Sequence, residues 1–344
     1  MTASHEDQVK ERFSKVPLDV PMNKALYDLA LARHEEAAQG HDFSAHASME
    51  LPDSDKFLEM KLKRPLGPIE TIEERIQLPS LPTVLLQLQA ELESQNNSTT
   101  RLAEIICMDI RLSTALLSLV NSALYSFPNK VETVERAITL MGTGEVSALA
   151  FSTRLLSMFE DTTPKVLPLE TYLRHSMACA TVAHQLAEAC NKPEPSKYFV
   201  AGLVHDIGRP ILFSAHPDMA KILFALQMQK GMPLDEGEEM VFDINHAMLG
   251  GLFLAKWGLP QSIVNAALLH HDPTACHGKE TAEIVFVANQ VTTALGFGCN
   301  YFYTGRPGQY IWDDLGITPD SLGNMLTGID EKLEILFAAV FPGE

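Results

Sequence analysis

The stretch that decides the fold is Ala201-Gly-Leu-Val-His-Asp-Ile-Gly-Arg209, in which a histidine and an aspartate follow an apolar helical run. Neutral imidazole and carboxylate groups are both ligands for Zn²⁺, Mn²⁺ and iron. We place His205 and Asp206 at the end of a helix, where the backbone can turn both side chains toward one point. Gly208 suits the position just past a helix end, where a left-handed conformation is common. The alternative for an isolated pair is a polar helix cap without metal.

Further histidines lie near helix ends or on apolar helical faces around this pair. They are His175, His246 and the adjacent His270 and His271. Burying an imidazole without a partner costs about 1–3 kcal/mol, so imidazoles and a carboxylate that converge on a cation would satisfy one another. A two-metal site of this kind suits the hydrolysis of phosphate esters. Arg209 is placed to hold the phosphate.

Seven other histidines fit surface positions better. They are His5, His34, His41, His46, His184, His216 and His277. His184 follows His175 by nine residues, which is about 180° around a helix, so we expect it to face away from the site. The acidic stretch Asp235–Glu239 is interpreted as a solvated helix start.

Apolar residues recur at helical spacing along most of the chain, and no alternating strand pattern is longer than four residues. We therefore predict an all-α fold: an N-terminal helical bundle packed on a second helical lobe, with an extended N-terminal arm. The predicted parts are a partly irregular arm (1–70), a bundle of short helices (75–163), a second helical lobe (164–295), and a loop with a final helix (296–344). Gly328 falls inside that final helix and should weaken it slightly.

Composition limits the classes of partner and the cellular location. The formal net charge of −18 would repel a phosphate backbone, which excludes general nucleic-acid binding. The five cysteines are scattered and form no Cys-x-x-Cys pair, which indicates reduced thiols. Because no apolar run approaches the length of a membrane helix and the N-terminus lacks a signal peptide, we expect a cytoplasmic protein with no membrane contact.

Together the motifs resemble the HD-related output domain (HDOD) family of bacterial signalling proteins. The resemblance rests on Gly202–Gly208, His246, Trp257-Gly-Leu-Pro260 and His270-His-Asp-Pro273, with support from Leu78-Pro-Ser-Leu-Pro82 and Asn121-Ser-Ala-Leu-Tyr125. It implies an all-α bundle packed on a lobe related to the HD phosphohydrolases. The positions that match metal ligands of that superfamily are His175, His205, Asp206, His246, His270 and His271.

The chain departs from the enzymes of the superfamily at three places. The closing aspartate is expected within Ile284–Gln290, where the chain offers Asn289, a neutral and weaker ligand. Arg209 stands where the related HD-GYP phosphodiesterases have a lysine, and no Gly-Tyr-Pro signature follows the paired histidines. These departures argue against hydrolysis of cyclic di-GMP.

Two functions fit this combination of residues. The first is a regulatory module that binds a signalling protein or a second copy of itself, and that keeps a vestigial or single-metal site for Fe, Mn or Zn. The second is a metal-dependent phosphohydrolase, either a phosphodiesterase or a nucleotide phosphatase. The retained ligands favour the enzyme, whereas Asn289 and the missing signature favour the module. We favour the module and assign no catalytic residue.

Overall fold

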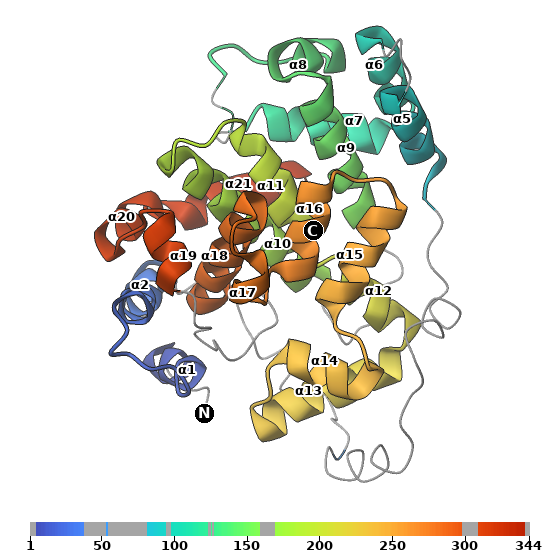
Figure 1. The fold of residues 1–344 in the computed structure, drawn as a ribbon. Coiled ribbons are helices and arrows are strands. Elements are labelled where there is room, and N and C mark those ends of the chain that lie inside the picture. The colour runs from blue at the N-terminus through green and yellow to red at the C-terminus, as the bar shows by residue number, and fades with distance from the viewer. Residues whose placement is uncertain are drawn as a thin grey trace.

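The computed structural model describes residues 5–37, 53, 81–93, 98–122, 125, 127–158, 169–297 and 309–340. Within these ranges every regular element is a helix, which confirms the predicted all-α fold (Figure 1). The domain boundaries predicted near residues 70–75 and 163–164 lie outside the described residues.

The first lobe is the predicted bundle of short helices, drawn in teal and green in Figure 1. Its helices are α5 (Thr83–Glu93), α6 (Thr99–Cys107), α7 (Ile110–Val120), α8 (Val134–Met141) and α9 (Thr143–Ser157). The side chains of Ser98, Asp109 and Thr133 cap the N-termini of α6, α7 and α8, which fixes where these helices begin. The bundle contacts the second lobe through α9, which packs on α11.

The second lobe carries the histidine motifs. Its helices are α10 (Leu169–Ala189), α11 (Pro195–Val204), α12 (Gly208–Ala215), α13 (Pro217–Lys230), α14 (Leu234–Phe242), α15 (His246–Lys256), α16 (Gln261–Leu269), α17 (Pro273–Cys276) and α18 (Glu280–Leu295). Every residue of α18 from Thr281 to Leu295 is buried, as expected for a helix enclosed by others. Its neighbours α10, α11 and α16 pack around it and form the frame of the site.

Two glycines of the opening motif allow helices to approach closely. A Cβ atom on Gly202 would lie 2.8 Å from the Cα of Ala180, where α11 crosses α10. A Cβ atom on Gly208 would lie 2.0 Å from the carbonyl oxygen of His246, where α12 meets the start of α15. The expected left-handed conformation of Gly208 is wrong, since Gly208 begins α12 and is not among the glycines with positive φ. Its small size instead brings His246 close to Asp206.

The arm and the first part of the C-terminal segment (309–325) lie together on one side of the second lobe (Figure 1). The arm contains α1 (His5–Arg12) and α2 (Pro21–Ala37), and α2 packs on α18 and α20. The C-terminal segment contains α19 (Gln309–Asp314), α20 (Pro319–Met325) and α21 (Ile329–Val340). The predicted single final helix is wrong, because Gly328 has φ = +70° and separates α20 from α21.

Among the described residues no helix is both long enough and apolar enough to cross a membrane. The four cysteines in the described ranges, Cys107, Cys179, Cys190 and Cys276, are free thiols, as the sequence predicts.

Candidate metal centre

The six predicted ligand residues come together in the second lobe, five of them at the ends of three helices and His175 within a fourth. His175 lies in α10, His205 and Asp206 form the turn after α11, His246 begins α15, and His270 and His271 follow α16. Two donor groups have all their ligand atoms within 4.8 Å of one another, and they share Asp206. The first group is Asp206, His246, His270 and His271, and the second is His175, His205 and Asp206. Metal binding by these residues itself stays a prediction.

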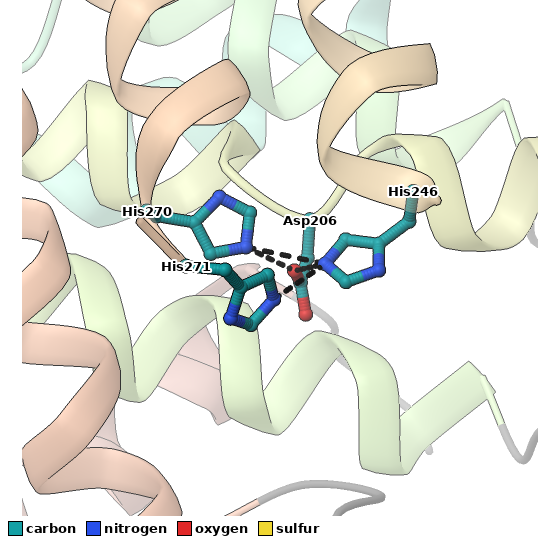
Figure 2. Close-up of side chains that lie close together, drawn as sticks. All are labelled: Asp206, His246, His270 and His271. Carbon is teal, nitrogen blue, oxygen red and sulfur yellow. Dashed lines mark hydrogen bonds and ion pairs between the residues drawn. The ribbon is translucent and has the colours of Figure 1, made fainter. Parts of the chain in front are cut away.

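Asp206 is the centre of the cluster (Figure 2). Its Oδ1 lies 3.0 Å from Nε2 of His246 and 3.2 Å from Nε2 of His270. Nε2 of His205 is 3.5 Å from the same oxygen. The other oxygen, Oδ2, lies 2.5 Å from Nη1 of Arg209 and 3.5 Å from Nε2 of His175. The two carboxylate oxygens therefore face different chemical surroundings.

Three of the histidines donate their Nδ1 proton to a backbone carbonyl. His175 bonds to Phe297 at 2.9 Å, His205 to Gly202 at 2.7 Å and His270 to Ala267 at 2.7 Å. A carbonyl oxygen only accepts hydrogen bonds, so Nδ1 carries the proton and Nε2 of the neutral ring is a free acceptor. This arrangement is typical of metal-ligating histidines.

The Nε2 atoms approach one another as closely as hydrogen-bonded pairs. His246 Nε2 lies 3.2 Å from His270 Nε2 and 2.9 Å from His271 Nε2 (Figure 2). Nε2 of His175 and Nε2 of His205 are buried and have no hydrogen-bond partner. Lone pairs that face each other at these distances repel unless a proton or a cation lies between them. The donor set therefore fits a divalent metal.

The electrostatics favour neutral histidines beside an ionised aspartate. Burial lowers the pKa of His175 to about 4 and that of His205 to about 3, and it also lowers the pKa of His270. Burial alone would raise the pKa of Asp206, but Arg209 and the neighbouring histidines hold it well below its usual value. These three rings are thus in the deprotonated form that a metal requires.

His246 differs from the other histidines because two carboxylates flank it. Burial and Arg209 lower its pKa, but Glu238 and Asp206 outweigh them and raise it to about 8. Its Nδ1 contacts Oε2 of Glu238, which also accepts a hydrogen bond of 2.8 Å from the His246 backbone N–H. At neutral pH, Nε2 of His246 therefore holds a proton that a metal would displace.

Glu238 is not among the residues that the sequence predicts for the site. The solvated interpretation of Asp235–Glu239 is wrong for this residue, because Glu238 is 0% exposed and its Oε1 lies 3.6 Å from Nε of Arg209. A signal exists in the sequence: Leu234, Glu238 and Val241 are spaced as one face of a helix, and the two apolar residues are buried. A carboxylate on an apolar helical face needs a buried partner.

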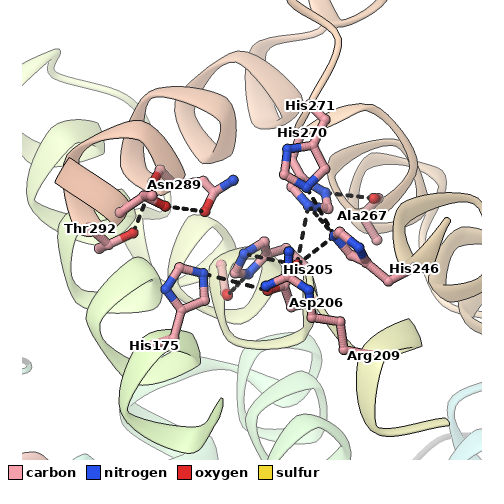
Figure 3. A network of polar contacts seen from close by, with 12 residues as sticks. His175, His205, Asp206, Arg209, His246, Ala267, His270, His271, Asn289 and Thr292 are labelled. Carbon is pink, nitrogen blue, oxygen red and sulfur yellow. Dashed lines mark hydrogen bonds and ion pairs between the residues drawn. The ribbon is translucent and has the colours of Figure 1, made fainter. Parts of the chain in front are cut away.

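The predictions for four other residues are untested, confirmed or wrong in different cases. Arg209 is buried and pairs with Asp206, so its predicted role in holding phosphate stays untested. Asn289 lies in α18, beside the cluster in Figure 3, and its Oδ1 accepts a 3.4 Å hydrogen bond from Thr293. The predicted surface position is wrong for His184, which is 4% exposed and packs edge-on against Tyr125. It is confirmed for His277, whose side chain is 51% exposed.

Comparison with known proteins places these features in a family context. A family model described as the HDOD domain matches residues 78–273, which is more than half of the chain. An uncharacterized protein of Treponema pallidum is 27% identical over 207 residues, which make up 59% of this chain and 39% of the relative. The chain thus spans less than half the length of that curated relative.

Solved structures share the fold. An HDOD domain protein from Geobacter sulfurreducens has a TM-score of 0.65 at 20% identity, over 83% of this chain and 99% of its own. A candidate phosphohydrolase from Shewanella amazonensis SB2B has a TM-score of 0.63 at 17% identity, over 79% and 98%. A candidate signal transduction protein from Marinobacter aquaeolei VT8 has a TM-score of 0.62 at 19% identity, over 90% and 71%. These likenesses show the fold alone.

Proposed function

Because the chain belongs to the HDOD family, we propose that it is a regulatory module that acts by binding a signalling protein or a second copy of itself. In this proposal the buried cluster around Asp206 holds one divalent metal, which orders the second lobe. The surroundings of Asp206, the burial of the cluster and the neutral side chain of Asn289 support this proposal.

The observation that carries the proposal is the difference between the two oxygens of Asp206. Oδ1 faces Nε2 atoms of three histidines, so a cation there gains three donors and displaces only the Nε2 proton of His246. Oδ2 is paired with the guanidinium of Arg209. A second cation bound through Oδ2 would lie beside that positive charge, and like charges repel strongly in a buried site. This favours one metal over two.

The burial of the cluster also supports a structural role for the metal. His175, His205, Asp206, His246 and His270 are 0–2% exposed, whereas His271 is partly exposed. Among these six residues only His271 exposes part of its surface to a substrate. Nitrogen-rich donors with one carboxylate suit Zn, Fe or Mn.

A metal-dependent phosphohydrolase is the second candidate function. It is favoured by the second donor group, since His175 and His205 share Asp206 with the first group and provide the ligands of a two-metal site. When bound, such ions supply Lewis-acid activation of water and of phosphate oxygens. The predicted phosphate role of Arg209 belongs to this alternative, and it would require the guanidinium to leave Asp206.

Metal content and turnover separate the two functions. Protein purified without chelator or nickel affinity should contain about one equivalent of metal and should not hydrolyse cyclic di-GMP or bis(p-nitrophenyl) phosphate. The double variant His205→Ala, Asp206→Ala should lose the metal. About two equivalents of metal, with steady turnover that His205→Ala abolishes, would overturn the module in favour of the enzyme.

The interaction itself is tested with the full chain. Pull-down from the native cell, together with light scattering of the purified protein, should recover a specific signalling partner or show a dimer. A monomer that recovers nothing above background would remove the support for a module.

A further inference from the structure

Two arginines of the arm contact the C-terminus of α18, and the residue that follows this helix contacts the candidate metal centre. Arg12 of α1 donates a 3.2 Å hydrogen bond to the carbonyl of Ala294, and Arg33 of α2 donates to the carbonyl of Leu295. Both carbonyls lie in the last turn of α18, which carries the negative end of the helix dipole. Two guanidinium groups from the arm therefore cap the C-terminus of α18.

Arg33 is held firmly in this position. Its Nε lies 2.9 Å from both carboxylate oxygens of Asp330 in α21, and its Nη2 lies 2.6 Å from one of them. The guanidinium also stacks on Phe297, with Cζ 3.8 Å from the ring centroid. The Arg33 side chain is 11% exposed, so this combination of ion pair and stacking is largely shielded from water.

Phe297 connects this stack to a candidate ligand. Gly296 has φ = +84° and ends α18, with Gly296 N–H bonded to Thr293 and Phe297 N–H bonded to Thr292. This turn directs the Phe297 carbonyl at Nδ1 of His175, 2.9 Å away. Arg33 is thus separated from His175 by a single residue, whose ring it covers and whose carbonyl fixes the imidazole.

We propose that the N-terminal arm is a clamp on the metal centre and that Arg33 is its positioning residue. Docking of α2 holds Phe297, Phe297 holds Nδ1 of His175, and Nε2 of His175 is thereby aimed at Asp206. A partner that displaces the arm releases this histidine and weakens the donor set. The inference deepens the proposed function, since it depends on the metal site described above and names the arm as its point of regulation. Nε2 of His175 faces Oδ2 of Asp206, so by linkage a metal bound through Oδ1 of that carboxylate strengthens arm docking by the same factor.

The clamp is tested first in the metal-free full-length protein. Arg33→Ala removes the stack and the ion pair, and Asp330→Asn is a milder variant that weakens only the ion pair. Lys24→Ala is the matched control, because Lys24 lies on the same helix and pairs with Asp28 at the exposed surface. Two readouts are taken: hydrogen exchange of arm peptides, and imidazole ¹⁵N shifts with the His175 signals assigned through His175→Gln.

Arm release should change His175 selectively. We expect both Arg33 and Asp330 variants to speed exchange in α2 and to shrink the difference between the two ring ¹⁵N shifts of His175. His205 and His270 should keep their shifts, because their Nδ1 partners belong to other helices. Faster exchange in the arm with unchanged His175 shifts would overturn the clamp. So would unchanged exchange in both variants, since Arg33 would then not hold the arm.

Metal titration separates this inference from the proposed function. If wild type binds metal, Arg33→Ala should lower the affinity about tenfold, as loss of a positioning partner of a ligand does, and Lys24→Ala should not. Metal should also slow exchange of the arm in wild type but not in His175→Ala. If wild type binds no metal, the metal role of the cluster fails, and the ¹⁵N shifts of His175 still decide whether the arm positions this ring.

Discussion

Replacing Glu238 by glutamine tests the electrostatics of the site most directly. Oε2 of Glu238 contacts both Nδ1 and the backbone N–H of His246, and Oε1 faces Nε of Arg209 at 3.6 Å. Glutamine keeps the size of the side chain and one oxygen acceptor. It replaces the other oxygen by an NH₂ group, which then faces the N–H donors of Arg209. The carboxylate charge beside His246 is lost.

The magnitude follows from the charges that surround the metal position. Asp206 and Glu238 are carboxylates, and Arg209 is a single guanidinium close to both. Once His246 has released its Nε2 proton, a divalent cation therefore enters a pocket with one excess negative charge, which Glu238→Gln removes. Second-shell partners of metal-bound histidines contribute about 10–100-fold to metal affinity, or roughly 1.4–2.7 kcal/mol. We also expect a loss of about 1–3 kcal/mol in the free energy of unfolding, because the buried Arg209 loses the carboxylate charge that faces its Nε.

The assay is calorimetric titration of Zn²⁺ or Mn²⁺ into metal-free protein, with urea unfolding measured in parallel. Glu239→Gln is the matched control: Glu239 is adjacent and exposed, and it accepts a hydrogen bond from Asn245 without touching His246. That control should stay within about 0.5 kcal/mol of wild type. Wild-type metal affinity together with wild-type stability in Glu238→Gln would refute the role assigned to Glu238.

Four further outcomes are expected. Asn289→Asp adds a carboxylate beside the cluster and should raise metal occupancy, measured by elemental analysis. His205→Ala with Asp206→Ala should abolish metal binding but leave the helical circular dichroism signal intact. Gly208→Ala places a methyl group against the His246 carbonyl and should lower the free energy of unfolding by about 3 kcal/mol, seen in thermal melts. Since the pKa of His246 is raised to about 8, metal affinity should fall by about tenfold per pH unit below that value and stay level above it.

The helical fold was predictable because its signals are local. Apolar spacing along each helix and polar caps such as Asp109 are readable without neighbours. The same holds for the six candidate ligands, whose residue types and positions at helix ends or on apolar helical faces stand out in the sequence. The break at Gly328 was also visible as a glycine, but its positive φ depends on how α20 and α21 pack on the core.

Features set by contacts between distant segments were not predictable. Burial of Glu238 depends on His246 and Arg209 as partners. His184 is buried against Tyr125, which lies 59 residues earlier in the sequence. Position 208 requires glycine because α15 crosses the chain there and leaves no room for a Cβ atom, whereas the sequence suggested only a turn. In each case the residue type is explained by a neighbour that periodicity and spacing cannot identify.

The contacts of helix α21 determine which fragments of the chain, and which exchanges of its parts, can keep the fold. It packs on α7 of the bundle and on α10 of the second lobe, and its Asp330 anchors the arm. Its apolar face, formed by Ile329, Leu333, Leu336 and Phe337, is buried against these parts. A fragment trimmed to the family match at residues 78–273 would lose this shared helix and expose the surfaces that it covers on both lobes. A chimera that exchanges lobes between relatives should therefore take α21 from the same protein as the helices that α21 contacts. An expressed fragment should extend through Val340.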